Sequence, residues 1–256
     1  MKVSEIYDII NDYAPYDSQE GFDNSGLNVG DPDDEVNAVL TCVDVSKDVI
    51  NEAINEGCNL IISHHPIIFR PLPNLLSSDY VGSLAIYAAK NDVNLLSAHT
   101  NMDKADGGIN DRLAEFLGGR NLRKIPEVDE YATFFDFDAQ TMEELTDTIS
   151  ATLRDDRVSS IGSGIVATAA VVGGAGGDYS LIDYCIKEGI VLITSELKHH
   201  LARMIDDRQG KIITVGHFTS ERIFVNIISD ILTDKVAVKE STQISPFNSI
   251  YGKEQL

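Results

Sequence analysis

The sequence predicts an α/β protein, in which short buried strands alternate with amphipathic helices. Three observations lead to this prediction. Apolar runs of strand length recur along the 256 residues, helical patterns separate them, and one strand–helix–strand unit occurs twice. With 43% hydrophobic residues the chain can form a core, and its length suits one large domain or two small ones.

The first strand–helix–strand unit lies at 37–63. Residues 37–45, NAVLTCVDV, and residues 59–63, NLIIS, have the apolar content of buried strands. The segment between them repeats apolar side chains at helical spacing, with Ser46 as the N-cap and Gly57 just past the helix end. This segment therefore predicts a β-α-β unit.

The same alternation continues toward the C-terminus. Thr141 and Glu144 have the spacing of a capping box that starts a helix. The other helices are expected at 80–90, 109–119, 181–189, 196–207 and 220–234, and the other strands at 93–98, 164–174, 190–195 and 211–216. The most polar stretch, 121–130, is the expected domain boundary, which gives a first lobe at 1–125 and a second at 126–256.

An internal repeat appears when Gly57 is aligned with Gly189. Ala38-Val39 then falls on Ala170-Val171, and Leu60-Ile61 falls on Leu192-Ile193. A duplicated β-α-β unit explains this match, and a coincidence between two ordinary units is the alternative. His64 falls on Glu196 in this alignment, so the corner after the second strand differs between the copies.

The composition excludes several classes of partner. The formal net charge is -21, which opposes binding to nucleic acid or to an anionic membrane as the main function. The apolar runs are shorter than the ~20 residues of a membrane span, and the N-terminus does not resemble a signal peptide. The three cysteines are far apart and are expected to lie in the core. We therefore expect a cytoplasmic protein.

The histidines follow predicted strands. His64 and His65 come directly after the strand at 59–63, His99 follows the strand at 93–98, and His217 follows the strand at 211–216. The other two histidines, His199 and His200, come about one helical turn after a strand. In open α/β sheets, ligands bind in the crevice at the carboxyl ends of the strands. A lone histidine at a strand end is usually a surface residue, but this repeated placement favours a binding site.

Carboxylates accompany these histidines at helical spacing. Asp103 lies four residues after His99, and Glu221 lies four residues after His217. Imidazole and carboxylate together are ligands for Zn, Fe, Mn, Co or Ni. The number of donors suits two ions about 3.5–4 Å apart that share a bridging group.

The motifs DNSGLNVG, SHHPIIF, SAHTNMDKADGGINDRLAEFLG and GHFTSE together resemble the Nif-three-like family (NGG-interacting factor three-like), whose members are catalogued as homologues of GTP cyclohydrolase one, type two. The resemblance covers nearly the whole chain. It implies a two-lobed α/β fold with an internal duplication and mixed sheets, two divalent transition-metal ions, and a toroidal homohexamer. By motif, the implied metal ligands are His64, His65, Asp103, His217 and Glu221, with the GHFTSE motif of the second lobe returning to a shared site.

Two further residues are candidates for proton transfer. The family commonly shows Thr-Gly-Asp where this chain has Thr194, Ser195 and Glu196, so Glu196 keeps a carboxylate with one more methylene. His99 is expected to orient a metal ligand, with direct ligation or a structural role as the alternatives. We expect a metal-dependent hydrolase that acts on a small nucleotide or phosphoester. The alternative is a non-enzymatic protein that handles metal or binds it for regulation.

Overall fold

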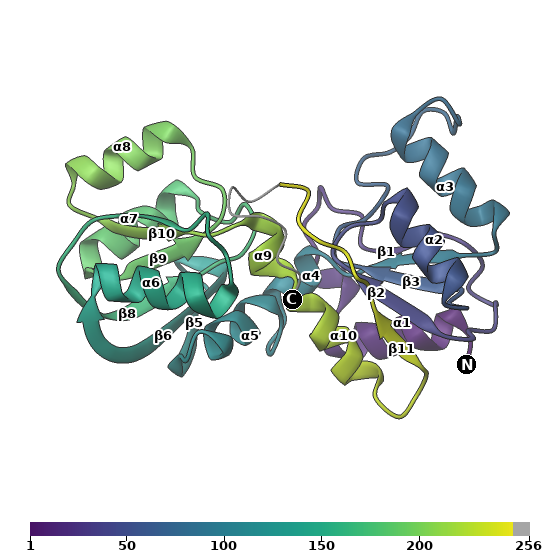
Figure 1. Cartoon of the computed structure of the whole chain (residues 1–256), viewed down its shortest axis with the longest axis horizontal. Coiled ribbons are helices and arrows are strands. Elements are labelled where there is room, and N and C mark those ends of the chain that lie inside the picture. Colours follow the sequence, from purple (N-terminus) through teal and green to yellow (C-terminus); the bar gives the residue numbers. More distant parts are fainter. Residues whose placement is uncertain (248–256) are drawn as a thin grey trace. The chain divides into compact units, whose positions relative to one another are not determined.

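The computed structural model describes residues 1–247, and these form two compact units (Figure 1). Unit 1 contains Met1–Gly108 and Phe224–Ile244, and unit 2 contains Ile109–Ile223 and the described residues from Ser245 on. The chain thus passes from unit 1 into unit 2 at Ile109, returns to unit 1 at Phe224 and enters unit 2 again at Ser245. The expected boundary near residue 125 falls inside unit 2.

Unit 1 is built on a five-stranded mixed sheet. The strand order is β1-β4-β3-β2-β11, in which β1 is antiparallel to β4 and the other pairs are parallel. The strands are β1 (Gly26–Val29), β2 (Val39–Cys42), β3 (Leu60–Ser63), β4 (Asn94–Ser97) and β11 (Val238–Glu240). The helices are α1 (Val3–Tyr13), α2 (Lys47–Asn55), α3 (Tyr80–Lys90), α4 (Thr100–Lys104) and α10 (Phe224–Leu232), with a short 3-10 helix at Tyr16–Ser18.

Helices cover both faces of this sheet (Figure 1). α2 and α3 pack on one face, where Leu40, Ile61 and Leu95 are buried, and α1 and α10 lie on the other. α2 begins as expected, because the Ser46 hydroxyl accepts a hydrogen bond from the Val49 N–H at 3.2 Å. It ends before Gly57, whose φ of 72° is a conformation that glycine adopts without strain.

Unit 2 is built on a six-stranded mixed sheet. The strand order is β5-β6-β8-β9-β10-β7, in which the neighbouring pairs β8–β9 and β9–β10 are parallel and the other pairs are antiparallel. The strands are β5 (Arg120–Ile125), β6 (Asp129–Thr141), β7 (Ser159–Ile161), β8 (Ile165–Val171), β9 (Val191–Thr194) and β10 (Lys211–Thr214). The helices are α5 (Ile109–Phe116), α6 (Met142–Leu153), α7 (Tyr179–Glu188), α8 (His199–Asp207) and α9 (His217–Glu221).

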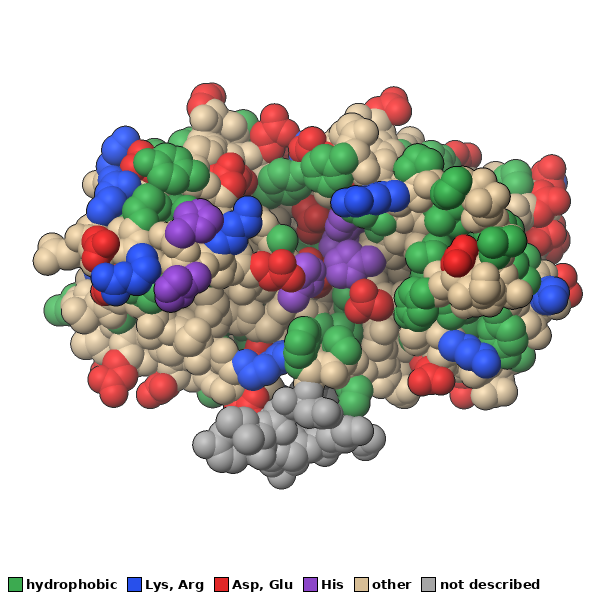
Figure 2. Space-filling view, turned by 90° about the horizontal axis from the view of Figure 1, so that it is seen from above, with side chains coloured by type: hydrophobic (Ala, Val, Ile, Leu, Met, Phe, Trp, Pro, Cys, Tyr) green, Lys and Arg blue, Asp and Glu red, His purple; other side chains and the backbone are tan. Residues whose placement is uncertain are grey.

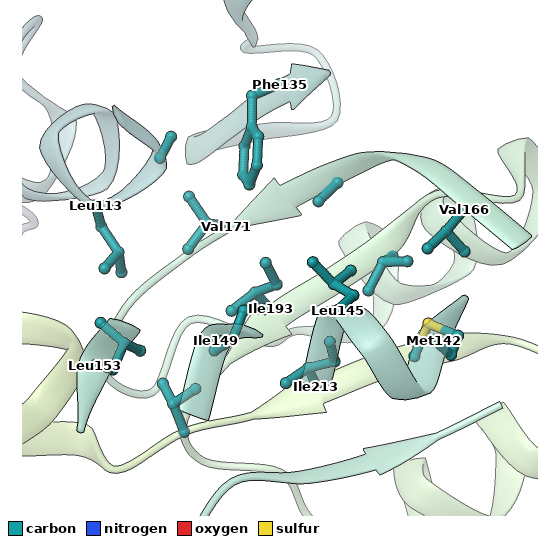
Figure 3. Packing of buried hydrophobic residues seen from close by; sticks show 14 residues of the cluster. Leu113, Phe135, Met142, Leu145, Ile149, Leu153, Val166, Val171, Ile193 and Ile213 are labelled. Atoms are coloured by element: carbon teal, nitrogen blue, oxygen red, sulfur yellow. The ribbon is translucent and has the colours of Figure 1, made fainter. Parts of the chain in front are cut away.

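The core of unit 2 also has two halves, one on each face of the sheet. α7 and α8 cover one half, and α5 and α6 cover the other. In the second half, Leu145 and Ile149 of α6 lie against Ile193 and Ile213 of the sheet (Figure 3). The expected capping box starts α6, since the Thr141 hydroxyl accepts from the Glu144 N–H at 3.2 Å while the Glu144 carboxylate accepts from the Thr141 N–H at 2.8 Å.

The internal duplication is visible in the two sheets. β2-α2-β3 in unit 1 and β8-α7-β9 in unit 2 are both parallel β-α-β units, each followed by a third parallel strand. Their registers differ by one residue. Val39 is opposite Leu60, whereas Val171, the residue aligned with Val39 in sequence, is opposite Ile193. The sequence alignment is therefore shifted by one position in the first strand of the repeat.

Three sequence expectations need correction. The polar stretch 121–130 forms most of β5 and the turn into β6, because alternating polar residues also suit a hairpin with one exposed face. The helix expected at 220–234 is two helices, since α9 buries Ser220 and Glu221 in unit 2 whereas α10 buries Phe224 and Ile227 in unit 1. α8 begins at His199 instead of residue 196.

The surface agrees with the acidic composition. Acidic side chains are scattered over the face shown in Figure 2, on elements of both units. No helix within residues 1–247 has the length and apolar character needed to cross a membrane.

We expect Gly82→Ala to destabilise the protein by about 1–3 kcal/mol. In most helices this change stabilises, because alanine is the better helix former. Gly82, in α3, is an exception, because an added Cβ would lie 2.4 Å from the Leu76 carbonyl oxygen. Urea unfolding measures the change, and Gly21→Ala is the control, since nothing lies within 4 Å of a Cβ at Gly21. An unchanged or raised midpoint for Gly82→Ala would contradict this packing argument.

Candidate metal centre

Three imidazoles of unit 1 gather where two neighbouring strands end. His64 and His65 follow β3, and their backbone N–H groups donate to Cys42 and Val43 at 3.2 and 3.0 Å. His99 follows β4, the strand beside β3, and precedes α4. The ring centroids of these histidines are 4.8 to 5.3 Å apart, and one ring nitrogen of each lies within 4.8 Å of those of the other two. This group could hold a metal ion.

A hydrogen bond at Nδ1 fixes the orientation of each of these rings. His64 Nδ1 donates to the Ala98 carbonyl oxygen at 3.0 Å, and His65 Nδ1 donates to Asp44 Oδ1 at 2.8 Å. His99 Nδ1 donates to Asp23 Oδ1 at 2.9 Å. Because each acceptor oxygen requires a proton on Nδ1, the neutral ring carries its lone pair on Nε2. This is the tautomer that metal-ligating histidines use when their second nitrogen is hydrogen-bonded.

The Asp103 carboxylate completes this donor set within unit 1. Asp103 lies on α4, one turn after His99, and its Oδ1 is 3.8 Å from His64 Nε2. Three imidazoles and one carboxylate are the donors that zinc and similar transition metals prefer. The chemistry of these residues therefore fits a divalent transition metal.

Asp23 holds His99 and the start of α4 in place. Besides His99, its buried carboxylate accepts from the Thr100 N–H at 3.1 Å, the Thr100 hydroxyl and the Asn24 N–H. Burial alone would raise the pKa of Asp23, but the hydrogen bonds from His99 and Thr100 lower this pKa far below its usual range. Sequence reasoning did not assign Asp23 a role, although the residue opens the quoted motif DNSGLNVG.

His217 and Glu221 lie together at one end of unit 2. Both are on α9, and His217 Nε2 is 3.0 Å from Glu221 Oε1. Two donors of one tetrahedral ion with bonds of ~2.0–2.1 Å are ~3.4 Å apart, which is close to this separation. The expected i,i+4 pairing of imidazole and carboxylate is thus present, on a helix that begins at His217.

Glu196 contacts the opposite side of the same imidazole. Its Oε1 accepts from His217 Nδ1 at 2.8 Å, and its side chain is mostly exposed. Glu196 therefore orients His217 in the way that Asp44 orients His65. The expected role of Glu196 in proton transfer stays a prediction.

Gly174 leaves space beside the His217–Glu221 pair. An added Cβ at Gly174 would lie 2.2 Å from Glu221 Oε1 and 3.3 Å from His217 Nε2, and its φ is 57°. The Gly174 N–H donates to the Ser220 hydroxyl at 3.1 Å. A side chain at this position would clash with Glu221, so the turn after β8 requires glycine here.

Asp155 and Arg157 hold the start of α9. The buried Asp155 carboxylate accepts from the Gly216 N–H at 2.6 Å and from Arg157 Nε at 3.0 Å. Burial raises the pKa of Asp155, but the hydrogen bonds from Gly216 and Arg157 outweigh it, so the pKa is lowered. Neither Asp155 nor Arg157 lies in a recognisable sequence motif. Asp155 binds Arg157, two residues away, and Gly216, 61 residues away along the chain.

The structure thus brings together the predicted ligands within each unit. His64, His65 and Asp103 meet in unit 1, and His217 and Glu221 meet in unit 2. A shared centre for the two sets stays a prediction. His199 and His200 are exposed at the start of α8 and contribute to neither set.

We expect Asp44→Ala to weaken metal binding by about 10–100-fold, the usual loss when a partner of a ligating histidine is removed. Without the Asp44 carboxylate, His65 loses the acceptor that fixes its orientation and tautomer. Chelator competition measures the affinity. Asp33→Ala is the control, because Asp33 is an exposed aspartate of the same unit that pairs with Lys2. Equal affinities for the two variants would show that the Asp44 contact does not support the site.

Comparison with known proteins agrees with the fold and the motifs. Residues 1–249 match the family model described as Duf34/NIF3 (NGG1p interacting factor 3). A GTP cyclohydrolase 1 type 2 homolog of Clostridium acetobutylicum is 31% identical over 239 residues, which are 90% of this chain and 88% of that protein. A protein of the same description from Clostridium perfringens is 35% identical over 86% of this chain and 87% of its own length.

Solved structures share the fold. Staphylococcus aureus protein SA1388 has a TM-score of 0.87 at 24% identity, covering 98% of this chain and 99% of that one. Reduced HcgD from Methanocaldococcus jannaschii has a TM-score of 0.81 at 26% identity, covering 94% and 97%. A Bacillus cereus protein related to NIF3 has a TM-score of 0.87 at 20% identity, covering 98% and 99%. The expected fold class, an α/β fold with two mixed sheets and an internal duplication, is confirmed, and the chain belongs to the Duf34/NIF3 family.

Proposed function

We propose that this protein is a metal-dependent hydrolase with a dinuclear centre formed by His64, His65, Asp103, His217 and Glu221. One observation carries the proposal. In both units, every imidazole of this set donates from Nδ1 to a protein oxygen, which directs Nε2 to the metal side. Histidines that merely cover a surface have no need of such anchoring.

Chain connectivity supports the sharing of one centre by the two donor sets. Phe224 belongs to unit 1, where its ring centroid is 5.3 Å from that of His64. Glu221 precedes Phe224 by three residues, and three residues span at most ~11 Å. The covalent chain therefore limits how far Glu221 can be from Phe224, whichever way the units are arranged.

Divalent Zn, Fe, Mn, Co or Ni would supply a Lewis acid and a water of lowered pKa at such a centre. The chain itself would position the donors and transfer protons. Glu196 is the proposed proton carrier on the His217 side, because its carboxylate is exposed and hydrogen-bonded to the ring. His99 is the second candidate, held by Asp23 on the other side.

The proposed substrate is a small nucleotide or another phosphoester. The relatives that the chain matches are described as homologues of a GTP cyclohydrolase, which supports a nucleotide. The donor set is compatible with metal-assisted hydrolysis, and nothing in it points to a pterin-forming step. The net charge of -21 argues against nucleic acid as the substrate.

A metal-handling or regulatory binding protein is the second candidate. The burial of two donors favours it, since His64 is fully buried and Glu221 is 4% exposed. Buried donors suit tight retention of an ion more than rapid exchange of substrate. The two candidates differ in turnover, not in metal content.

A metal analysis followed by a hydrolysis screen tests the proposal. The protein is purified without added metal, its metals are counted, and it is assayed on nucleotides and phosphoesters. We expect two ions per chain and a hydrolytic activity that is lost in His64→Ala and kept in His200→Ala, a change at an exposed histidine of α8. Metal without turnover would favour the binding protein, and protein without metal would refute both candidates.

The proposed compartment is the cytoplasm. Cys42, Cys58 and Cys185 are free and buried, which suits a reducing environment. Burial raises the pKa of Cys185 to about 12, so this thiol stays protonated and unreactive at neutral pH.

Family resemblance supports a toroidal homohexamer. The net charge of -21 opposes assembly by self-repulsion, so the hexamer is expected to be most complete at high salt, where screening acts within ~10 Å or less. Light scattering at about 50 mM and about 500 mM salt measures the oligomeric state at weak and strong screening. A monomer at both concentrations would contradict the prediction.

A further inference from the structure

We propose that Phe22 and Phe69 form a stacking platform for the base of a nucleotide, in unit 1 beside His99. The proposal rests on the proposed hydrolase function and narrows its substrate class, from phosphoesters in general to those that carry an aromatic base. It gives a role to two exposed side chains that take no part in the metal donor set or in the buried core.

Both phenylalanine rings lie at the surface and contact each other. Phe22 is 65% exposed and Phe69 is 38% exposed. Their ring centroids are 6.1 Å apart and their planes are inclined by 64°, which is an edge-to-face geometry that aromatic pairs prefer. Adjoining apolar side chains that stay exposed often mark a binding surface. The pair therefore presents aromatic surface that a ligand can cover.

Hydrogen bonds hold the two loops that carry these rings. The side-chain amide of Asn24 donates to the carbonyl oxygen of Ile68 at 2.6 Å, and Ile68 directly precedes Phe69. Asp23, which follows the other phenylalanine in the chain, accepts from His99 Nδ1 at 2.9 Å. The loops are thus fixed before a ligand arrives, which lowers the entropic cost of binding.

The surroundings of Phe69 favour a small anionic ligand. Its ring centroid is 5.9 Å from that of His99, so a base stacked on Phe69 lies close to the proposed metal donors. Arg70 follows directly, is exposed, and has no ion-pair partner within residues 1–247. Such a cation attracts a phosphate group, which most of the surface of a chain with a net charge of -21 repels. A nucleotide combines the aromatic ring and the phosphate that these residues suit.

Stacking has a signature of its own in binding experiments. Every nucleobase has a planar π-face, so the platform should bind nucleotides with little regard to the identity of the base. Loss of a stacking aromatic residue weakens binding about 5- to 150-fold. That loss should fall on ligands with a base and spare ligands that offer only phosphate to the metal ions.

The test compares two ligands on the 256-residue chain with its metals bound. The α,β-methylene analogue of ADP carries a base and resists hydrolysis between its phosphorus atoms, whereas methylenediphosphonate lacks the base and the ribose. Calorimetry gives the dissociation constant of each ligand. We expect Phe22→Ala and Phe69→Ala each to weaken the ADP analogue about 5- to 150-fold and to leave methylenediphosphonate within about twofold of the wild type.

Two control variants separate stacking from a general effect on the surface. Phe69→Tyr keeps the aromatic face and should bind the ADP analogue like the wild type. Leu75→Ala removes another exposed apolar side chain between β3 and α3 and should change the binding of neither ligand. Saturation-transfer NMR adds a readout that a structural role would not move, because the base protons of the analogue should receive strong saturation from the wild type and little from Phe69→Ala.

Three results would overturn the platform: equal weakening of both ligands, unchanged binding of the ADP analogue in both alanine variants, or no binding of the analogue to the wild type. Light scattering tests the other occupant. If either alanine change dissociates an oligomer, the rings pack against a second copy of the chain, and the platform is overturned as well.

These outcomes are distinct from a failure of the proposed function. Base-selective binding without turnover of any phosphoester would refute hydrolysis and keep the platform. Turnover of base-free phosphoesters without nucleotide binding would keep hydrolysis and overturn the platform. Circular dichroism of every variant excludes unfolding as the cause.

Discussion

Asp23→Asn is expected to lower the free energy of unfolding by about 3–5 kcal/mol. This is the usual cost of removing one partner of a buried charged pair. The Asp23 carboxylate accepts hydrogen bonds from His99, from the Thr100 N–H and hydroxyl, and from Asn24. Asparagine has nearly the same size, but its NH₂ group would replace one of the two carboxylate oxygens. That NH₂ group would then face hydrogen-bond donors. At least one buried donor would then lose its acceptor.

Urea unfolding of the metal-free protein measures this effect. Asp12→Asn is the control, because Asp12 is an exposed aspartate on α1. The control is expected to change stability by less than about 0.5 kcal/mol. If the two variants unfold at the same urea concentration, the network around Asp23 does not stabilise unit 1.

Asp155→Asn is expected to destabilise unit 2 by about 2–4 kcal/mol at pH 7. The buried carboxylate accepts from the Gly216 N–H, at the start of α9, and from two N–H groups of Arg157. Asparagine can keep the bond from Gly216 with its oxygen, but it loses the charge that balances Arg157. The start of α9 and the position of His217 should then become less well defined.

The same variant predicts a pH dependence. The folded pKa of Asp155 is lower than the unfolded value near 3.9, so its charged form stabilises the protein above that pH. This stabilisation is lost as the pH falls through the folded pKa. The difference between wild type and Asp155→Asn should therefore be constant from about pH 5 to 7 and shrink below about pH 4.

Urea unfolding at pH 7, 5, 4 and 3 checks this dependence within the range where the wild type folds. Asp147→Asn, at an exposed position of α6, is the matched control. A difference that stays constant down to pH 3 would show that Asp155 is not stabilised as a charged group.

Helices and strands that are marked by local sequence patterns could be predicted from the sequence. α3 spans the expected residues 80–90, and the capping box at Thr141 starts α6 as expected. Apolar periodicity and capping act within one helical turn, so a single sequence contains them. The ends of the parallel strands could likewise be predicted, which placed His64, His65 and His99 at one sheet edge.

The remaining features depend on contacts between distant residues. Asp23 reaches His99 across 76 positions, and Asp155 reaches Gly216 across 61. No periodicity or capping pattern reports such pairs. The division of 220–234 into α9 and α10 was missed for the same reason, because the apolar pattern does not state which unit each half enters.

The threading of the chain through the two units has a consequence for protein synthesis. The contiguous stretch Ile109–Ile223 contains all six strands of the second sheet, so that sheet can form soon after its last strand leaves the ribosome. The first sheet must wait for β11, which joins β2 only after residue 240 has been made, and for α10, which buries Phe224 and Ile227. The N-terminal half is therefore translated first but completed last, and its apolar surface stays exposed to chaperones during that delay.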